Sequence, residues 1–340
     1  MIFKFPYFIA EISANHCGKI STAKKLIKCA KLNGADAVKL QTYTADTMTL
    51  KSNKKYFKVN DGLWKGYTLW NLYNEAHTPL SWHKTLFDYA KKIGITIFST
   101  PFDETAVTFL EKLNCPMYKI SSFEMTDIPL VKKVASTKKP IIISTGMASL
   151  KEIDLTYKTA RKYGAKDITL LYCVSNYPAK NSDFNINNIK ILKEKYKCRV
   201  GLSDHSLDQN VAITSIGAGA EMIEKHIALD GQKKGLDIKF SLKGEKIKIF
   251  RNAIDSAYEL LGKKKFFRNT SEEKSKMFRR SIFVVRKITT GDTLNKFNIR
   301  KIRPGYGISA SYYEKILGKK STVNIEANEP LTKKLLSKMI

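Results

Sequence analysis

The feature that most restricts the fold is an alternation of short apolar segments with amphipathic stretches along the first 260 or so residues. Each apolar segment is about as long as a β-strand buried on both faces, and the stretches between them have helical spacing. The segments span residues 6–13, 36–43, 95–101, 117–122, 140–146, 168–175, 199–206 and 222–229. Eight strand–helix units predict an α/β fold, a (β/α)8 TIM barrel.

A doubly wound open sheet is the alternative architecture, but such sheets more often have five to seven strands. No G-x-G-x-x-G motif follows the first segment, so a dinucleotide-binding sheet is unsupported. The clearest helix candidates span residues 21–35, 103–113, 149–164 and 207–220. We expect the first of them to begin at a Ser/Thr cap and to end at Gly34.

The chain divides into a barrel domain over residues 1–262, a charged linker over 263–276 and a small β-rich domain over 277–340. The last barrel helix is expected at roughly residues 243–262. Residues 44–78 are too many for an ordinary loop between a strand and its helix. This segment is either a loop that shapes the substrate pocket or a helical excursion with packed aromatic side chains.

Polar or ionisable residues occur at the end of every predicted strand. They are Glu11, Lys39, Gln41, Ser99, Thr100, Lys119, Ser122, Ser144, Thr145, Ser175, Ser203, Asp204, His205, Glu224, Lys225 and His226. In a barrel these residues form a ring around the C-terminal mouth, where barrel enzymes carry out their chemistry. Lys39 and Lys119, together with several hydroxyls, indicate an oxyanion or phosphate site. The alternative is that the lysines pair with Glu11 or Glu124.

Histidine is rare, with five in the chain. His205 and His226 end the last two strands, which are neighbours in a closed barrel, so they are candidate ligands for a divalent ion. The alternative is that each is a hydrogen-bonded core group. His16 is a further site member or a turn residue, and we expect His77 and His83 to be substrate-loop or surface residues.

The formal net charge of +29 suggests a nucleic-acid partner, but only nine of the 60 basic residues are arginine. Nucleic-acid surfaces favour arginine forks, so a generic lysine-rich surface is the simpler interpretation. No apolar run is long enough for a transmembrane helix, and the N-terminus resembles a strand more than a signal peptide. Five scattered cysteines without a C-x-x-C pair indicate free thiols in the core and a cytoplasmic location.

An ordered set of motifs runs through the chain: AEISANHCG, VKLQTY, FSTPFD, YKISSFE, ISTGMAS, SNYP, VGLSDHS and IEKH. In these motifs the chain resembles the sialic acid synthase family. The later segment SIFVVRKITTGDTLNKFNIRKIRPGYGI resembles the C-terminal antifreeze-like (SAF) domain of that family. Within the family, residues 63–83 most resemble the pseudaminic acid synthase branch.

The resemblance implies that the enzyme condenses phosphoenolpyruvate with an open-chain N-acetylated sugar aldehyde to give a nine-carbon 2-keto acid. In the pseudaminic branch the sugar is 2,4-diacetamido-2,4,6-trideoxy-L-altrose. Phosphoenolpyruvate would contact Lys39, Thr100, Lys119, Ser122, Ser144, Ser175 and Ser203. Sialic acid synthases often have Asn at the position of Ser175. The sugar would face Gln41, Glu124, Tyr177 and Asp237.

The resemblance also implies roles for the remaining site residues. His205 and His226 would hold manganese or magnesium, and Glu11 would lie near the reacting water. Arg303 would reach the sugar in the partner subunit's barrel of a domain-swapped homodimer.

Three alternative functions remain. A 3-deoxy-octulosonate-phosphate-type synthase would lack the small C-terminal domain. N-acetylneuraminate or legionaminate synthesis would differ only in the sugar. A basic nucleic-acid-binding protein would show binding that depends strongly on salt and not on the ring of strand-end residues.

Overall fold

The computed structural model describes residues 3–338 and separates the chain into two compact units, residues 1–262 and 263–340. In the first unit eight parallel strands follow one another around a sheet, and β8 pairs with β1 to close it. The strands are β1 Tyr7–Glu11, β2 Ala37–Thr42, β3 Thr96–Pro101, β4 Tyr118–Ile120, β5 Ile141–Ser144, β6 Ile168–Cys173, β7 Arg199–Asp204 and β8 Met222–Ala228. The predicted closed barrel is therefore confirmed.

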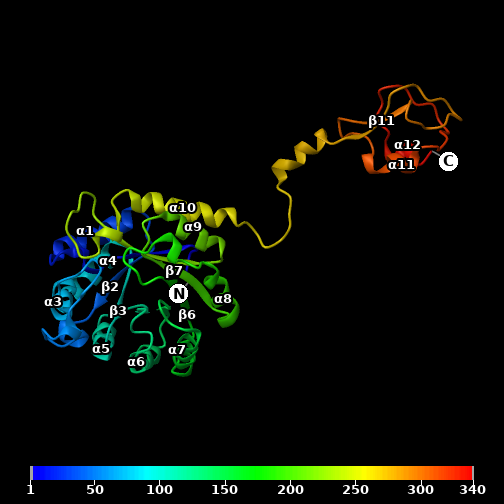
Figure 1. Cartoon of the computed structure of the whole chain (residues 1–340). Coiled ribbons are helices and arrows are strands. Elements are labelled where there is room, and N and C mark those ends of the chain that lie inside the picture. Colours follow the sequence, from blue (N-terminus) through cyan, green and yellow to red (C-terminus); the bar gives the residue numbers. More distant parts are fainter. Residues whose placement is uncertain (1–2, 339–340) are drawn as a thin grey trace. The chain divides into compact units, whose positions relative to one another are not determined.

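Helices surround the barrel strands (Figure 1). They are α1 Ile20–Leu32, α4 Leu80–Ile93, α5 Glu104–Lys112, α6 Ile128–Ser136, α7 Leu150–Lys162, α8 Asn187–Tyr196, α9 Gln209–Gly217 and α10 Lys246–Leu260. Each helix has a buried apolar face against the sheet, as the helical spacing predicts. A short strand, β9 Leu242–Lys243, pairs with the end of β8.

The start of α1 differs from the prediction. The helix begins at Ile20, and its N-cap is Lys19 rather than a serine or threonine. The Lys19 carbonyl accepts hydrogen bonds from the backbone N–H groups of Thr22 and Ala23, so Ser21 lies inside the first turn. By contrast, α7 begins with a capping box in which Ser149 and Glu152 satisfy each other's backbone N–H groups.

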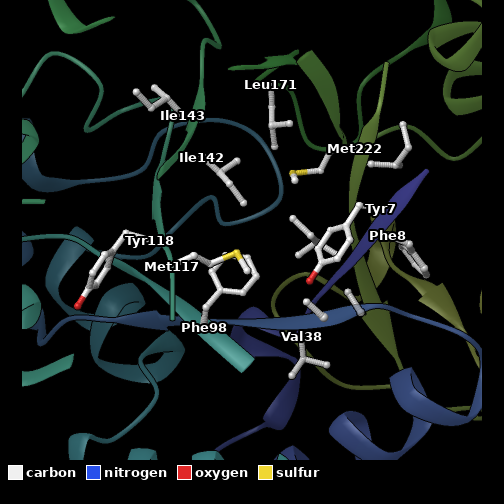
Figure 2. Close-up of a cluster of buried hydrophobic side chains, with 14 of the residues drawn as sticks. Tyr7, Phe8, Val38, Phe98, Met117, Tyr118, Ile142, Ile143, Leu171 and Met222 are labelled. Carbon is white, nitrogen blue, oxygen red and sulfur yellow. The ribbon is translucent and has the colours of Figure 1, made fainter. Parts of the chain in front are cut away.

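The core of the barrel is apolar below its C-terminal mouth. Figure 2 shows Phe98, Met117 and Ile142 close together at the centre, whereas Phe8 and Tyr118 point away from them. This alternation follows from the two-residue period of a strand, which sends neighbouring side chains to opposite faces. The buried apolar layer closes the barrel, so polar side chains nearer the mouth form a site with a dry base.

The register of the parallel strands brings the predicted site residues together. Glu11 lies directly opposite Lys39 on β2 and His226 on β8. Ser203 on β7 lies opposite Glu224 on β8. Four strands thus place their polar residues in two successive layers of the barrel, with Glu224 one layer below Glu11 and His226.

The long segment between β2 and α4 contains α2 Ala45–Met48, a 3-10 turn at Lys55–Phe57 and α3 Leu69–Ala76. An isolated antiparallel bridge joins Lys58 to Thr68, and residues between them form a hairpin. The segment is therefore a helical excursion with an added hairpin, which we call the β2–α4 insertion (residues 44–78).

The first element of the second unit is a 3-10 helix at Thr270–Phe278, and the unit contains a small separate core. Its elements are β10 Ser281–Val284, β11 Ile299–Ile302, a 3-10 turn at Ala310–Tyr312, α11 Tyr313–Ile316 and α12 Lys333–Leu336. β10 and β11 are antiparallel, and isolated bridges join β10 to Ser309 and Pro330. In neither unit, over residues 3–338, is there a helix long and apolar enough to cross a membrane.

Candidate active site

Four buried charges form a network at the C-terminal mouth of the barrel. The Nζ atom of Lys39 lies 2.5 Å from Oε2 of Glu11 and 3.4 Å from Oε1 of Glu224. The same oxygen of Glu224 lies 3.1 Å from Nζ of Lys119. All four side chains are at most 5% exposed. We call these four residues the charged cluster.

Hydroxyl groups surround the charged cluster. Lys39 donates a hydrogen bond to Oγ1 of Thr100 at 3.2 Å, and Ser203 donates to Glu224 at 3.1 Å. The hydroxyl of Ser144 is buried and has no hydrogen-bond partner within residues 3–338. A buried hydroxyl without a partner costs stability, so its position indicates a place for a polar ligand.

Gly146 allows two more predicted hydroxyls to approach each other. Its φ is +43°, and a Cβ atom there would lie 2.6 Å from Oγ of Ser122 and 2.9 Å from Oγ of Ser175. These distances are shorter than ordinary contacts, so a larger residue would push the two serines apart. The loop after β5 therefore needs glycine at this position.

The charges of the cluster shift one another's proton affinities. Burial acts to raise the pKa of Glu224, but Lys119 and Lys39 outweigh it and bring the pKa to about 2. Burial raises the pKa of Glu11, and Lys39 offsets only part of that effect. Burial also lowers the pKa of Lys119 despite its contact with Glu224. Of the two carboxyl groups, Glu11 is thus the one that accepts a proton more readily.

The pairing of the lysines is partly as the sequence suggested. Lys39 pairs with Glu11, but Lys119 pairs with Glu224 rather than with Glu11 or Glu124. Sequence reasoning included Glu224 only in the ring of strand-end residues and missed it as the shared counter-charge. The available signal was its spacing, because Glu224 and His226 are two residues apart on one strand and so face the same side.

The two strand-end histidines lie side by side, with ring centroids 5.5 Å apart. Nδ1 of His205 lies 3.0 Å from the carbonyl oxygen of Val174, which can only accept, so Nδ1 carries the proton and Nε2 is left to bind a ligand. Nδ1 of His226 is buried without a hydrogen-bond partner within the described residues, and it lies 3.7 Å from Oδ2 of Asp237.

The two histidines differ in how readily they would bind a divalent ion. Burial acts to lower the pKa of His205, but Cys173 outweighs it and raises the pKa above its usual value, so this ring must lose a proton before it can be a ligand. Burial, with His205 nearby, lowers the pKa of His226 well below its usual value, so its ring is neutral as metal binding requires. Within residues 3–338, no three His, Cys, Asp or Glu side chains are grouped closely enough to hold a metal alone. An ion held by these two imidazoles alone would have to complete its shell with water or substrate.

Aromatic rings form one side of the histidine pair. Tyr177 lies 4.5 Å from the His205 ring, and Phe240 lies 4.9 Å from the His226 ring, measured between centroids. Tyr177 and Phe240 are themselves 5.2 Å apart. The carboxylate of Asp237 accepts from the backbone N–H of Ala14 at 3.4 Å, which fixes the loop after β8 to the loop after β1. Phe240 is a site residue that sequence reasoning missed.

Two other predicted sugar-facing residues have defined positions. Gln41 follows Lys39 by two residues and lies opposite Thr100 on β3, so it is on the mouth side of the charged cluster. Arg303 directly follows β11 in the second unit and is exposed, and its role stays a prediction.

Glu124 lies in the loop after β4, is half-buried and hydrogen-bonds with Ser121. Burial raises its pKa to about 7. Because the folded protein holds this proton more tightly than the unfolded chain, stability from this group declines as the pH rises from about 4.5 to about 7.

We expect the free energy of unfolding of Glu124→Gln to fall by about 1–2 kcal/mol less than that of the wild type between pH 5 and pH 8. This figure takes into account the partial exposure of the side chain, which weakens the effect. Urea unfolding followed at several pH values measures it. Glu75→Gln, at an exposed position in α3, is the control and should leave the pH dependence unchanged. Equal slopes for the wild type and Glu124→Gln would refute the assignment.

The remaining histidines lie away from the charged cluster. His83 was expected at the surface or in a substrate loop, but it is fully buried in α4, where its Nε2 lies 2.8 Å from Oγ1 of Thr42. The side chains of Thr42 and His83 are on the outer, helix-facing side of the sheet, because Lys39 and Gln41 face inward. His16 is a buried turn residue whose Nδ1 accepts from the N–H of Gly18. His77 ends α3.

One cysteine departs from the expected role of core filler. The Sγ atom of Cys173 lies 3.8 Å from Oγ of Ser175 and 3.9 Å from Nδ1 of His205, at the mouth end of β6. Burial acts to raise its pKa, but His205 outweighs this and lowers it to about 7. The thiol is thus part of the polar surroundings of the site rather than of the apolar core.

Comparisons with known proteins show which family the chain resembles in sequence and fold. The NeuB family matches residues 26–266, and the SAF domain matches residues 279–337. The pseudaminic acid synthase of Helicobacter pylori is 41% identical over 96% of both chains. The N,N'-diacetyllegionaminic acid synthase of Campylobacter jejuni is 36% identical over 94% of this chain and 97% of its own.

Among solved structures, the N-acetylneuraminic acid synthetase of Leptospira borgpetersenii, in complex with citrate, is 29% identical with a TM-score of 0.72. It covers 79% of this chain, and 89% of its own length is matched. The match to the NeuB family covers most of the barrel. The C-terminal ends of β2 to β8 lie within the matched residues, and β1 lies before them. The chain therefore belongs to the NeuB family and carries a SAF domain after its barrel.

Proposed function

We propose that this chain is a pseudaminic acid synthase. It condenses phosphoenolpyruvate with 2,4-diacetamido-2,4,6-trideoxy-L-altrose, cleaves a C–O bond and releases phosphate and a nine-carbon 2-keto sugar acid. The observation that carries the proposal is the charged cluster beside two histidines at the barrel mouth. The full-length similarity to pseudaminic acid synthases supports the choice of sugar.

The charged cluster is suited to an anionic substrate. Lys39 and Lys119 would contact the carboxylate and phosphate of phosphoenolpyruvate, with hydroxyls completing the shell. These hydroxyls belong to Thr100, Ser122, Ser144, Ser175 and Ser203. Because both lysines already lie at fixed positions against Glu224, little reorganisation is needed when the anion enters.

A divalent metal, manganese or magnesium, would be held by His205 and His226. Its charge is needed, because two lysines and two glutamates already cancel in the cluster and the entering anion adds negative charge. When bound, such an ion supplies Lewis-acid polarisation of the sugar aldehyde oxygen.

The reaction requires a new C–C bond and the addition of one water. Carbon 3 of phosphoenolpyruvate attacks the aldehyde carbon, which takes up a proton at its oxygen. Water adds at carbon 2, and the resulting tetrahedral centre expels phosphate with its bridging oxygen. Glu11 is the group we assign to the proton of this water, because its raised pKa favours proton acceptance.

The sugar would lie between the charged cluster and the aromatic rings. Gln41, Glu124, Tyr177 and Asp237 are the residues we assign to it, and Arg303 of a second copy would complete the site in a homodimer. Sedimentation at working concentration tests the dimer.

Legionaminate or N-acetylneuraminate synthesis by the same mechanism is the second candidate, supported by the legionaminic acid synthase similarity. A 3-deoxy-octulosonate-phosphate-type synthase is less suitable because the chain carries a SAF domain. Phosphate release from phosphoenolpyruvate with each sugar, with metal supplied, separates these possibilities. The fastest release is expected with the diacetamido-trideoxy-altrose, and a faster rate with another sugar would reassign the substrate.

We expect His205→Ala and His226→Ala each to lower the affinity for Mn²⁺ by at least ~10-fold, because each substitution removes one of the two imidazole ligands. Calorimetric titration of metal-free protein with MnCl₂ measures the affinity. His77→Ala, at the end of α3, is the control and should bind as the wild type does. Unchanged Mn²⁺ affinity in both site variants would contradict the assignment.

A further inference from the structure

Trp64 connects the β2–α4 insertion to the far side of the barrel mouth. The hairpin that carries it is held by hydrogen bonds from Val59 N–H to the Tyr67 carbonyl and from Gly66 N–H to the Val59 carbonyl. From this hairpin, the indole N–H of Trp64 donates to the carbonyl of Leu236 at 3.1 Å. A residue of the β2 loop is thus fixed to the loop after β8.

The Trp64 ring also joins the aromatic side of the site. Its centroid lies 5.6 Å from that of Tyr177, with the planes at 52°. Tyr177 in turn packs against His205 with the ring planes at 49°, and Leu236 is adjacent to Asp237, which faces His226. Trp64 therefore contacts both loops that flank the histidine pair.

The two sides of the mouth differ in chemistry. In the charged cluster Lys39 and Lys119 offer groups for an anion. By contrast, the partly exposed Trp64 and Tyr177 pack with the buried Phe240 into an aromatic group, which we call the aromatic wall. A sugar with two acetamido groups and a 6-deoxy carbon carries three methyl groups. Such methyl groups gain the most binding free energy when they are buried against aromatic faces, because no polar group has to be desolvated there.

We propose that Trp64 is a specificity-determining residue that packs against the methyl groups of a diacetamido-trideoxy sugar. This inference rests on the proposed function and adds to it a residue that selects the sugar. Trp64 completes the aromatic wall only because the insertion reaches across the mouth. Sugars with one acetamido group and a 6-hydroxyl gain less from this wall.

Trp70 provides a matched control in the same insertion. Its indole N–H donates to Oδ1 of Asp46 at 2.8 Å, and Nζ of Lys51 lies 4.6 Å from its ring centroid. These contacts stay within the insertion. A change at Trp70 thus tests for general damage to the insertion without altering the aromatic wall.

The test measures steady-state phosphate release by the full chain with Mn²⁺, using 2,4-diacetamido-2,4,6-trideoxy-L-altrose and N-acetylmannosamine. For Trp64→Ala we expect the KM of the diacetamido sugar to rise ~10- to 100-fold and its preference over N-acetylmannosamine to shrink ~10-fold. The KM of phosphoenolpyruvate should stay within ~2-fold. Trp64→Phe, which keeps a ring but loses the N–H donor, should show a smaller rise of the same kind, and Trp70→Phe none.

The outcomes separate the inference from the proposed function. No phosphate release by the wild type with any sugar would overturn the proposed function. If the wild type is active and Trp64→Ala keeps its KM for the diacetamido sugar and its sugar preference, the role of Trp64 is overturned. An equal rise in the KM values of the diacetamido sugar and phosphoenolpyruvate would overturn it as well. If Trp64→Ala does not fold, Trp64→Phe decides the question. In addition, sugar-dependent quenching of tryptophan fluorescence should be lost in Trp64→Phe and kept in Trp70→Phe.

Discussion

Glu224→Gln is expected to lower the free energy of unfolding of the barrel by about 3 kcal/mol. The substitution keeps the shape of the side chain but removes the charge that Lys39 and Lys119 share. Lys39 keeps Glu11, whereas Lys119 is left as a buried cation without a counter-charge. Urea unfolding of the barrel at neutral pH measures the loss.

An added anion should restore part of this stability. Phosphoenolpyruvate brings negative charge to the same lysines, so it should raise the melting temperature of Glu224→Gln more than that of the wild type. Glu221→Gln is the matched control, because Glu221 pairs with Lys193 at 2.5 Å but the two side chains are 21% and 36% exposed. That change should cost less than about 1 kcal/mol. A Glu224→Gln protein as stable as the wild type would refute the role of Glu224.

Glu11→Gln is expected to reduce kcat roughly 10²- to 10⁴-fold. The amide keeps the hydrogen bond from the Ser13 N–H, which reaches Glu11 at 2.8 Å, but it cannot accept the proton of the attacking water. Because Lys39 and Lys119 remain to bind phosphoenolpyruvate, its KM should change far less than kcat.

Phosphate-release kinetics with saturating sugar check the Glu11 prediction. Thermal unfolding confirms that the variant is folded, and Glu75→Gln at an exposed position should keep full activity. Full turnover by Glu11→Gln would remove Glu11 from the proton transfer.

The eight strands could be predicted from the sequence because each lies in a short segment rich in apolar residues that the barrel buries on both faces. The ring of strand-end polar residues followed from the same pattern, since parallel strands present their C-terminal ends at one mouth. The start of α1 could not be predicted from composition, because Lys19 at the N-cap makes no side-chain capping hydrogen bond and so leaves no capping signal in the sequence.

Long-range register decided the parts that sequence reasoning missed. The shared role of Glu224 depends on how β8 aligns with β7 and on the reach of two lysines from other strands. Trp64 and Phe240 lie in long connections whose course over the mouth has no periodic signal. His83 was misplaced although a signal was available, because it precedes Leu86 and Phe87 by three and four residues and so lies on the buried face of α4.

The most direct test of the central claim follows the bridging oxygen of phosphoenolpyruvate. The substrate is labelled with ¹⁸O at that oxygen and incubated with the protein, Mn²⁺ and 2,4-diacetamido-2,4,6-trideoxy-L-altrose, and the products are analysed by mass spectrometry. The account predicts an unlabelled nine-carbon 2-keto acid and labelled phosphate. Label retained in the keto acid, or no nine-carbon acid with any diacetamido or monoacetamido sugar, would contradict it.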